Sequence, residues 1–252
     1  MHDRAGYADF YDRQLALMRN PWQQRRFADD LRAIAARLPA GFTALDLGCG
    51  TGNLTLKLLA LGVRVVGVDS SQAMLYRLAA KAGPDAPLEL ICGDADEFLA
   101  GCDRRFNMVC ACSFYHHLPD YLATIGAAAD RVAPGGAFYL VHEPADRRGV
   151  DAVTRWLEWL DFRWQRFEAR TQIGGRVGRH DPYYDPASLA DYWELAGGLD
   201  QHAIARLLAA RGLSVRVRRY DSKRHRLLHV LAELLGTCHL LRILATRPPS
   251  RP

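Results

Sequence analysis

The fold of this chain is decided by the stretch Leu45-Asp46-Leu47-Gly48-Cys49-Gly50-Thr51-Gly52-Asn53, which joins an apolar run to a helical pattern. Gly48 and Gly50 permit a tight turn, because glycine adopts backbone conformations that other residues avoid. They also let backbone N–H groups approach a ligand at the positive end of the following helix. In an open α/β sheet, such a turn after the first strand is where a nucleotide-like ligand binds. The stretch therefore predicts a strand, a ligand-binding turn and a helix.

The hydrophobic pattern around this turn alternates between a period typical of strands and one typical of helices. Short β-rich runs predict strands at residues 43–47, 63–68, 88–92, 106–112, 137–142, 213–220 and 239–246. Helical patterns cover residues 20–38, 53–61, 71–82, 121–132 and 200–210, and a further apparent helix lies within 223–236. Strands that alternate with helices form a mostly parallel sheet with helices on both faces. The predicted fold class is therefore α/β.

The alternation lapses between Pro144 and Leu199, where a Trp- and Arg-rich helical pattern, a glycine-rich loop and a Tyr/Pro-rich turn follow one another. We interpret this segment as an insertion that forms a lid over the ligand site. The chain is then a single domain of 252 residues. Its parts are N-terminal helices (1–41), a cofactor-binding core (42–143), the lid (144–199) and a C-terminal helix with two closing strands (200–252).

The composition is that of a globular protein, because 49% hydrophobic residues are enough to bury a core. The net charge of +5 is unevenly placed: residues 1–200 carry −4 and residues 201–252 carry +9. A basic segment can bind RNA, a phosphorylated acceptor or an anionic membrane surface. The alternative is a solvated strand edge that is protected by charge. We expect no nucleic-acid partner, whereas peripheral membrane contact through this tail stays open, as does the oligomeric state.

The six cysteines form no C-x-x-C pair and mostly lie in apolar runs, which predicts reduced thiols and a cytoplasmic location. The first 20 residues lack the continuous apolar core of a secretory signal. Residues 227–245 reach membrane length but contain two histidines, a glutamate and an arginine, which are costly in lipid. We therefore expect no membrane-spanning helix.

Acidic residues accompany three successive predicted strands: Asp46 lies in the first, Asp69 ends the second, and Asp94 follows the third. Parallel strands bring their carboxyl ends to one crevice, where an acid such as Asp69 accepts the hydroxyls of a ribose. Two ligand classes fit this crevice, nicotinamide or flavin dinucleotides and S-adenosylmethionine. Asn53 stands where the dinucleotide fingerprint requires Gly or Ala. Asp46 repels a pyrophosphate but suits an ammonium and a sulfonium, which favours S-adenosylmethionine.

At residues 42–142 the chain resembles the class I S-adenosylmethionine-dependent methyltransferases. The resemblance is carried by the glycine loop 46–52, Val68-Asp69-Ser70, Gly93-Asp94-Ala95, Pro134-Gly135-Gly136 and Phe114-Tyr115-His116-His117-Leu118-Pro119-Asp120. The last of these is similar to the His-His-Leu segment of small-molecule members, including the quinone-biosynthesis C-methyltransferases. The family implies a Rossmann-like, seven-stranded, mostly parallel sheet with an antiparallel last strand. We expect this chain to add an N-terminal helical cover and a lid insertion, and it departs from the family where residues 144–199 exceed the plain connection and where 223–236 add an apparent helix.

The resemblance also implies the cofactor, S-adenosyl-L-methionine, with S-adenosyl-L-homocysteine as product. The cofactor-binding residues that it implies are Tyr11, Asp46, Gly48, Cys49, Gly50, Asn53, Asp69, Ser70, Met74, Gly93, Asp94, Ala95, Cys112 and Ser113. Gly48 and Gly50 would approach the methionine part, Asp69 would hold the ribose, and Asp94 would contact the adenine edge. Two alternatives stay open: Asp46 as a buried turn-former, and Asp94 as part of a solvated acidic loop.

Methyl transfer from a sulfonium is an in-line displacement, so the enzyme needs alignment, a dry site, and a base only where the nucleophile carries a proton. The candidates for that base are His116, His117 and Glu143. A histidine after the fourth strand can instead cap the next helix or shape the cofactor pocket. No acid cluster matches the metal-dependent catechol-type members, so no metal is predicted.

The acceptor pocket is expected to be aromatic, with Tyr7, Tyr115, His142, Trp156 and Trp164 as candidates. Trp156 and Trp164 share one helical face of the lid, which either packs on its own domain or lines the pocket. We predict methyl transfer to O, N or C of a small apolar or aromatic molecule, such as a secondary metabolite, a quinone or a lipid-like acceptor. The alternatives are an RNA methyltransferase, and a protein of this fold that binds the cofactor without transferring methyl.

Overall fold

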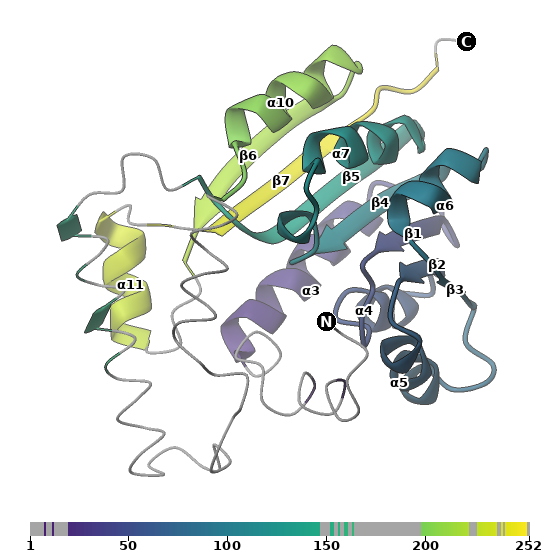
Figure 1. Cartoon of the computed structure of the whole chain (residues 1–252), viewed down its shortest axis with the longest axis horizontal. Helices are drawn as coiled ribbons and strands as arrows, with labels where there is room; N and C mark the ends of the chain where they lie inside the picture. Colours follow the sequence, from purple (N-terminus) through teal and green to yellow (C-terminus); the bar gives the residue numbers. More distant parts are fainter. Residues whose placement is uncertain are drawn as a thin grey trace.

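The computed structural model of the chain describes residues 8, 12, 20–146, 152–153, 156, 159–160, 163, 198–221, 226–235, 238 and 240–250. Seven strands form one sheet in the order β3-β2-β1-β4-β5-β7-β6 (Figure 1). They are β1 (Thr43–Leu47), β2 (Arg64–Asp69), β3 (Leu88–Cys92), β4 (Phe106–Cys112), β5 (Val132–Pro144), β6 (Ser214–Tyr220) and β7 (Leu240–Thr246). Strands β1 to β5 pair in parallel, and β7 is antiparallel to both of its neighbours. The predicted seven-stranded, mostly parallel sheet is confirmed.

Helices cover both faces of this sheet, as Figure 1 shows. One face carries α3 (Pro21–Ala35), α4 (Thr55–Leu59) and α5 (Gln72–Ala82), and the other carries α6 (Ala95–Gly101), α7 (Tyr121–Asp130) and α10 (Gln201–Ala210). A short 3-10 helix, η1 (Tyr115–His117), joins β4 to α7, and α11 (Arg226–Leu235) precedes β7. No helix among the described residues combines the length and the apolar character needed to cross a membrane.

The sheet separates two hydrophobic cores, because successive side chains of a strand point to opposite faces. Met108 and Cys110 of β4 join the core beneath α3, while Val109 and Ala111 join the core beneath α7. All four side chains are fully buried. Burial on both faces is what a parallel sheet requires, and it fixes the register of the strand ends that build the site.

Three elements differ from the pattern predicted from the sequence: β5 begins at Val132 rather than at residue 137, and neither η1 nor α6 was expected. The segment Ala95–Gly101, which has the residues of an acidic loop, is the helix α6, because Asp94 caps it. The Asp94 carboxylate accepts hydrogen bonds from the N–H groups of Asp96 at 2.8 Å and Glu97 at 3.2 Å. An N-cap of this kind satisfies backbone donors that a helix start leaves without partners.

The segment interpreted as a lid leaves the sheet and returns to it at one point. Ala145 and Leu199 form an isolated parallel bridge, in which Asp146 N–H donates to Leu199 O at 3.0 Å. Leu199 N–H in turn donates to Pro144 O at 2.8 Å. This pairing is what an insertion at the carboxyl end of β5 requires. Most of the segment lies outside the described residues, so the division of the chain into four parts stays a prediction.

Candidate functional site

The carboxyl ends of five neighbouring strands form one edge of the sheet. The register aligns Leu47 with both Val68 and Ala111, and it aligns Asp69 with Cys92. The segments that follow β3, β2, β1, β4 and β5 are therefore adjacent in that order. The strand order reverses between β1 and β4, and open α/β sheets bind their ligands at such a point. The edge brings together most of the cofactor-binding residues predicted from the sequence.

The glycine loop after β1 is built from left-handed turns, with φ values of +64° at Gly48, +52° at Gly50 and +100° at Gly52. The N–H groups of Gly48 and Cys49 donate to Val68 O at 2.8 and 3.1 Å, which ties the loop to β2. A Cβ atom on Gly48 would lie 2.2 Å from Cδ2 of Phe114, so the loop lies directly against the segment that follows β4. Glycine is required there for both conformation and space.

Asp69 braces this loop through both of its carboxylate oxygens. Oδ2 accepts from Gly50 N–H at 2.8 Å, and Oδ1 accepts from Ser71 N–H at 2.9 Å. Each oxygen of a carboxylate has a second lone pair, so a ligand hydroxyl can still bind. Asp69 is only partly buried, whereas Asp94, the cap of α6, is exposed.

Asp46 has the internal partners that a buried turn-former needs. The Thr55 hydroxyl donates to its Oδ2 at 2.6 Å, and the Cys110 thiol lies 3.7 Å from its Oδ1. Its side chain is 2% exposed. Burial raises the pKa of Asp46 to about 7, although the hydrogen bonds from Thr55 and Cys110 lower it. With a pKa near 7, the Asp46 carboxyl changes between its neutral and its ionised form near neutral pH. A charged ligand that binds close to it can therefore shift Asp46 from one form to the other.

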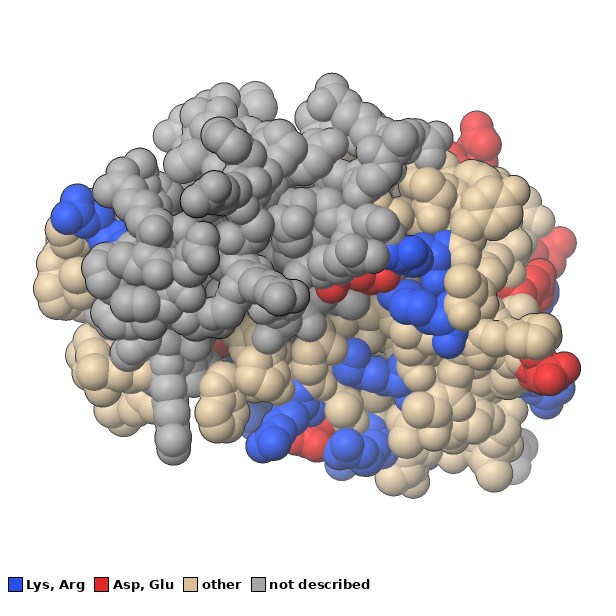
Figure 2. Space-filling view, turned by 90° about the horizontal axis from the view of Figure 1, so that it is seen from below, with Lys and Arg blue, Asp and Glu red and all other residues tan. Residues whose placement is uncertain are grey.

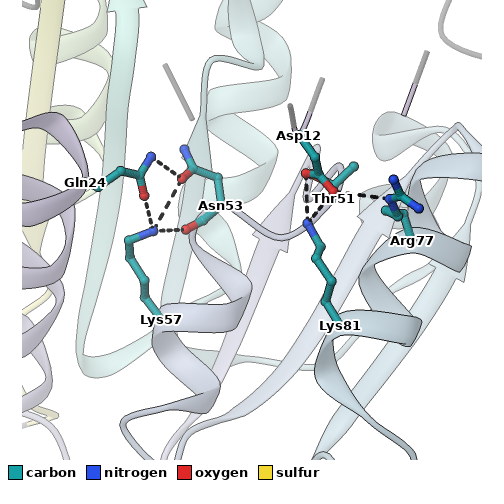
Figure 3. A network of polar contacts seen from close by, with 7 residues as sticks. All are labelled: Asp12, Gln24, Thr51, Asn53, Lys57, Arg77 and Lys81. Atoms are coloured by element: carbon teal, nitrogen blue, oxygen red, sulfur yellow. Dashed lines mark hydrogen bonds and ion pairs between the residues drawn. The ribbon is translucent and has the colours of Figure 1, made fainter. Parts of the chain in front are cut away.

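A polar network that sequence reasoning missed joins α3 and the N-terminal segment to the glycine loop (Figure 3). Asn53 accepts from Gln24 at 3.0 Å and donates to Cys112 Sγ at 3.3 Å. The Lys57 ammonium donates to Gln24 Oε1 at 2.5 Å and to Asn53 O at 2.7 Å. Burial lowers the pKa of Lys57. Asn53 is thus held by the protein itself at the start of α4.

Asp12 forms the other half of this network, since it contacts both the loop and α5 (Figure 3). Its carboxylate accepts from the Thr51 hydroxyl at 2.5 Å. It also forms ion pairs with Lys81 at 2.9 Å and Arg77 at 3.3 Å. Arg77 and Lys81 are four residues apart on one face of α5, but no local pattern connects them with an acid near the start of the chain. Tyr11, its predicted neighbour at the cofactor, lies outside the described residues.

The remaining predicted cofactor residues differ in how far they reach solvent. Cys49, Met74, Ala95 and Cys112 are buried, Gly93 and Ser113 are half-buried, and Ser70 is exposed. Ser113 has a φ of +55°, and His142 has a φ of +61°. This conformation is uncommon outside glycine and is found where surrounding structure enforces it. The two strained residues follow β4 and lie near the end of β5, which are neighbouring strands at the same edge.

Glu143 is fully buried and holds the segment after β4. Its Oε1 accepts from the N–H groups of Phe114 at 2.7 Å and Tyr115 at 3.0 Å. Its Oε2 accepts from His116 N–H at 3.2 Å and contacts His116 Nδ1 at 2.6 Å. Burial alone would raise the pKa of Glu143, but His116 and these backbone donors together hold it below its ordinary value. Glu143 is thus an ionised carboxylate that fixes the orientation of the His116 ring.

The two adjacent histidines differ in exposure. His116 is nearly buried, with 8% of its side chain exposed, whereas His117 is exposed. Their rings lie 4.2 Å apart between centroids with an angle of 33°. Glu143 accepts at Nδ1 of His116 and so holds this ring in one orientation.

A β-bulge in β5 accompanies the change of direction between the side chains of His142 and Glu143, which point to opposite faces of the sheet. The register between β5 and β7 shifts between Val141 and Glu143, which places His142 within the bulge. Its Nδ1 contacts Gln23 Nε2 at 2.8 Å and Tyr220 Oη at 3.2 Å, on the face covered by α3. Glu143 turns to the opposite face, toward η1. Bulges next to functional sites often redirect a side chain in this way.

The predicted acceptor residues are not brought together by the described structure. Tyr115 lies in the core with its side chain fully buried, 6.4 Å from Phe138 between ring centroids. It is therefore not at the surface of the site. Trp156 is 57% exposed, and Tyr7 and Trp164 lie outside the described residues. Within the part of the chain that the structure describes, no three His, Cys, Asp or Glu side chains are arranged to hold a metal ion.

The fold and the glycine-loop edge define a nucleotide-binding α/β protein of the methyltransferase type. Residues 19–198 match the family described as "Methyltransferase domain", and the chain belongs to this family. Its fold is that of the magnesium protoporphyrin IX methyltransferase from Synechocystis PCC 6803 with bound S-adenosylmethionine. The two share a TM-score of 0.59 and 16% identity over 98% of this chain and 93% of that one.

Two curated relatives are methyltransferases whose names refer to quinones. The ubiquinone biosynthesis O-methyltransferase of Rhodopseudomonas palustris (strain HaA2) is 25% identical over 192 residues, which are 70% of this chain and 74% of that protein. The demethylmenaquinone methyltransferase of Bacillus licheniformis (strain ATCC 14580) is 38% identical over 102 residues, or 39% of this chain. The match spans 44% of the length of that second relative.

Proposed function

We propose that the chain transfers a methyl group from S-adenosylmethionine to a small apolar or aromatic acceptor. The observation that carries the proposal is the edge formed by the glycine loop and Asp69, with the buried Asp46 directly before the loop: acids lie where a dinucleotide site offers donors to a pyrophosphate. A ligand with an ammonium and a sulfonium suits carboxylates, whereas a pyrophosphate is repelled. Membership of the methyltransferase domain family supports the same cofactor.

The residues present fit this cofactor. Asp69 would hold the ribose while it keeps its two loop contacts, and Gly48 and Gly50 would let the methionine part approach the backbone. When bound, S-adenosylmethionine supplies a methyl group activated by the positive sulfur. The protein's contribution is then alignment of the acceptor and exclusion of water, since an in-line displacement needs little else.

For an acceptor that carries a proton, we propose His116 as general base and Glu143 as its positioning residue. Glu143 Oε2 lies 2.6 Å from Nδ1 of His116 and holds the ring in one orientation. A buried carboxylate that fixes the ring and stabilises the protonated imidazole is a common arrangement for such bases. His117 is exposed beside it and is the second candidate.

The names of the two curated relatives favour a quinone precursor, or a related ring with a hydroxyl or an acidic carbon, as the acceptor. The RNA alternative gains little support from the surface. Figure 2 draws one face of the molecule, on which the lysine and arginine side chains of the described residues lie among neutral and acidic ones. A basic patch or stripe without such interruptions is the electrostatic pattern typical of RNA binding.

The test is a calorimetric titration of the full chain with S-adenosylmethionine, S-adenosylhomocysteine and NADH. We expect the first two to bind and NADH to give no heat. Binding of NADH alone would move the chain to the oxidoreductases. With the cofactor established, formation of S-adenosylhomocysteine is followed with phenolic and quinol acceptors. Product with none of them, and with RNA instead, would overturn the small-molecule assignment.

A further inference from the structure

A pocket of about 250 Å³ lies between α3 and the strands β5, β7 and β6. Gly135, Gly136 and Ala137 line it, and these residues are near the amino end of β5. Because a strand rises about 3.3 Å per residue, the pocket lies roughly 20 Å from the carboxyl end of β5. It is therefore separate from the glycine-loop edge.

The walls of this pocket are unusually basic, since Arg37, Arg216, Arg218 and Arg242 all contribute to it. Among the described residues that line the pocket, Asp30 is the only acid. Asp30 is matched within the protein, because Arg242 donates to both of its oxygens at 2.6 and 2.8 Å. The Tyr139 hydroxyl donates to Asp30 at 2.8 Å as well. Arg242 therefore balances the charge of Asp30, and Arg37, Arg216 and Arg218 are not needed for that.

Those three arginines have exposed side chains. Within the described part of the chain, Arg37, Arg216 and Arg218 have no ion pair or hydrogen bond through their guanidinium groups. Three positive charges without counter-charges raise the potential of a small concave surface. Guanidinium groups bind phosphate oxygens in a bidentate manner, which makes arginine the usual residue at phosphate sites.

Protection of a strand edge also places charges on β6, but it does not account for this geometry. Alternate residues of β6 point to opposite faces. Arg216 and Arg218 line the pocket, whereas Arg219 faces α10 and donates to Gln201 Oε1 at 2.9 Å. Arg37 converges on the same pocket from the end of α3, a different element. Convergence from two elements is what a ligand site requires and an edge does not.

We propose that this pocket binds a phosphate group through Arg37, Arg216 and Arg218. Ile34, Leu38 and Leu244 supply an apolar wall beside the arginines, so a carbon skeleton next to the phosphate would gain an additional contact there. Two sources have this chemistry, a free phosphorylated metabolite and the headgroup of an anionic lipid. The site does not depend on the proposed methyl transfer.

The test titrates the full chain by calorimetry with glycerol 3-phosphate and with inorganic pyrophosphate at low salt. In a second arm, the chain is sedimented with phosphatidylglycerol vesicles and with phosphatidylcholine vesicles. The variant is Arg216→Gln/Arg218→Gln, and the matched control is Arg219→Gln, on the same strand but on the other face. Circular dichroism verifies that all three proteins fold, as expected for exposed positions.

We expect binding that is weaker by at least about tenfold in the double variant and within about twofold of wild type in Arg219→Gln. Binding of the soluble phosphates identifies a metabolite site. Binding of phosphatidylglycerol vesicles alone, with the same dependence on Arg216 and Arg218, identifies a headgroup site. Absence of binding in both arms overturns the proposal. An equal loss of affinity in Arg219→Gln overturns the proposal too, because binding would then depend on the total positive charge of the edge strand and not on the pocket.

Discussion

Asp46 lies in a buried position where its charge is costly. Burial raises its pKa from 3.8 to about 7. Between these values the folded protein holds a proton that the unfolded chain has released. The stability contributed by protonated Asp46 is therefore complete at acid pH and is lost as pH rises from 3.8 to about 7. Its size is on the order of 4 kcal/mol, at about 1.4 kcal/mol per pKa unit.

We expect Asp46→Asn to remove this part of the pH dependence. The amide keeps the size of the side chain but does not titrate. Urea unfolding of the ligand-free protein, followed between about pH 5 and pH 8, measures the slope of the free energy of unfolding against pH. Asp85→Asn is the control, because Asp85 is exposed and its replacement should leave the slope as in wild type. A wild-type slope in Asp46→Asn would contradict the assignment.

Release of the Asp46 proton on ligand binding can also show whether the ligand lies close to this carboxyl. A cationic ligand close to Asp46 favours the ionised carboxylate and lowers its pKa. Binding of S-adenosylmethionine below pH 7 should then release a proton, and the measured heat should depend on the ionisation enthalpy of the buffer. Asp46→Asn should lose that dependence while it still binds. Equal heats for wild type in phosphate and Tris buffers would show that Asp46 is only a turn-former.

Glu143 presents the opposite case, a buried carboxylate whose pKa is lowered. Its stabilising effect is present above the ordinary value of 4.5 and is lost as pH falls through the lowered value. Glu143→Gln replaces one acceptor oxygen by an NH2 group, which cannot accept from His116 or from the backbone. We expect a loss of about 3 kcal/mol in the free energy of unfolding and a large loss of turnover.

Denaturant unfolding measures that loss, with Glu97→Gln, an exposed position in α6, as the control. His116→Gln separates the two effects. It should slow turnover of a proton-bearing acceptor and leave the affinity for S-adenosylmethionine nearly unchanged. Full turnover in His116→Gln at every pH would mean that alignment alone carries the chemistry and that Glu143 is a structural anchor.

The glycine loop keeps its conformation because the segment after β4 packs directly against it. A Cβ atom at Gly48 would meet the Phe114 ring, and φ there is +64°. Gly62 has a similar φ of +75°, but nothing lies within 4 Å of its Cβ position. Gly62→Ala therefore isolates the backbone strain, about 1 kcal/mol. Gly48→Ala adds overpacking and should cost about 1–3 kcal/mol more.

Thermal unfolding of the two variants measures the difference. Titration with S-adenosylmethionine then shows whether the shifted loop still binds, and we expect weaker binding in Gly48→Ala alone. Equal stability of the two variants would show that Phe114 moves aside freely and does not close the loop.

The strands and long helices could be predicted because their hydrophobic periods are long enough to be unambiguous. Helix α6 could not, since its seven residues are too few for a period and its acidic start has the composition of a loop. Asp46, Asp69 and Asp94 were found because each lies within or close to the last residues of a predicted strand, and the sequence pattern marks where a strand ends. Asp12 was missed, because its partners Thr51, Arg77 and Lys81 are brought to it only by the tertiary fold.

The two hydrophobic cores lie on opposite faces of one sheet, and β4 and β5 contribute side chains to both. A strand cannot lose its packing on one face and keep its hydrogen bonds undisturbed on the other. The described core should therefore behave as one cooperative unit, although the cores share no side chains. The length of the chain alone does not decide this, because 252 residues suffice for one domain or for two.

Cooperativity can be tested by weakening each face separately. Leu31→Ala opens the core beneath α3, and Leu208→Ala opens the core beneath α10; both side chains are fully buried. Each substitution should cost about 2–5 kcal/mol and shift a single transition that tryptophan fluorescence and circular dichroism report identically. S-adenosylmethionine at a hundredfold excess over its Kd should restore about 2.7 kcal/mol in both variants.

A second transition in either variant would mean that the faces unfold independently and that the single-domain prediction is wrong. If only Leu31→Ala were rescued by the ligand, the binding edge would be coupled to α3 alone, through the contacts of Gln24 with Asn53 and Lys57.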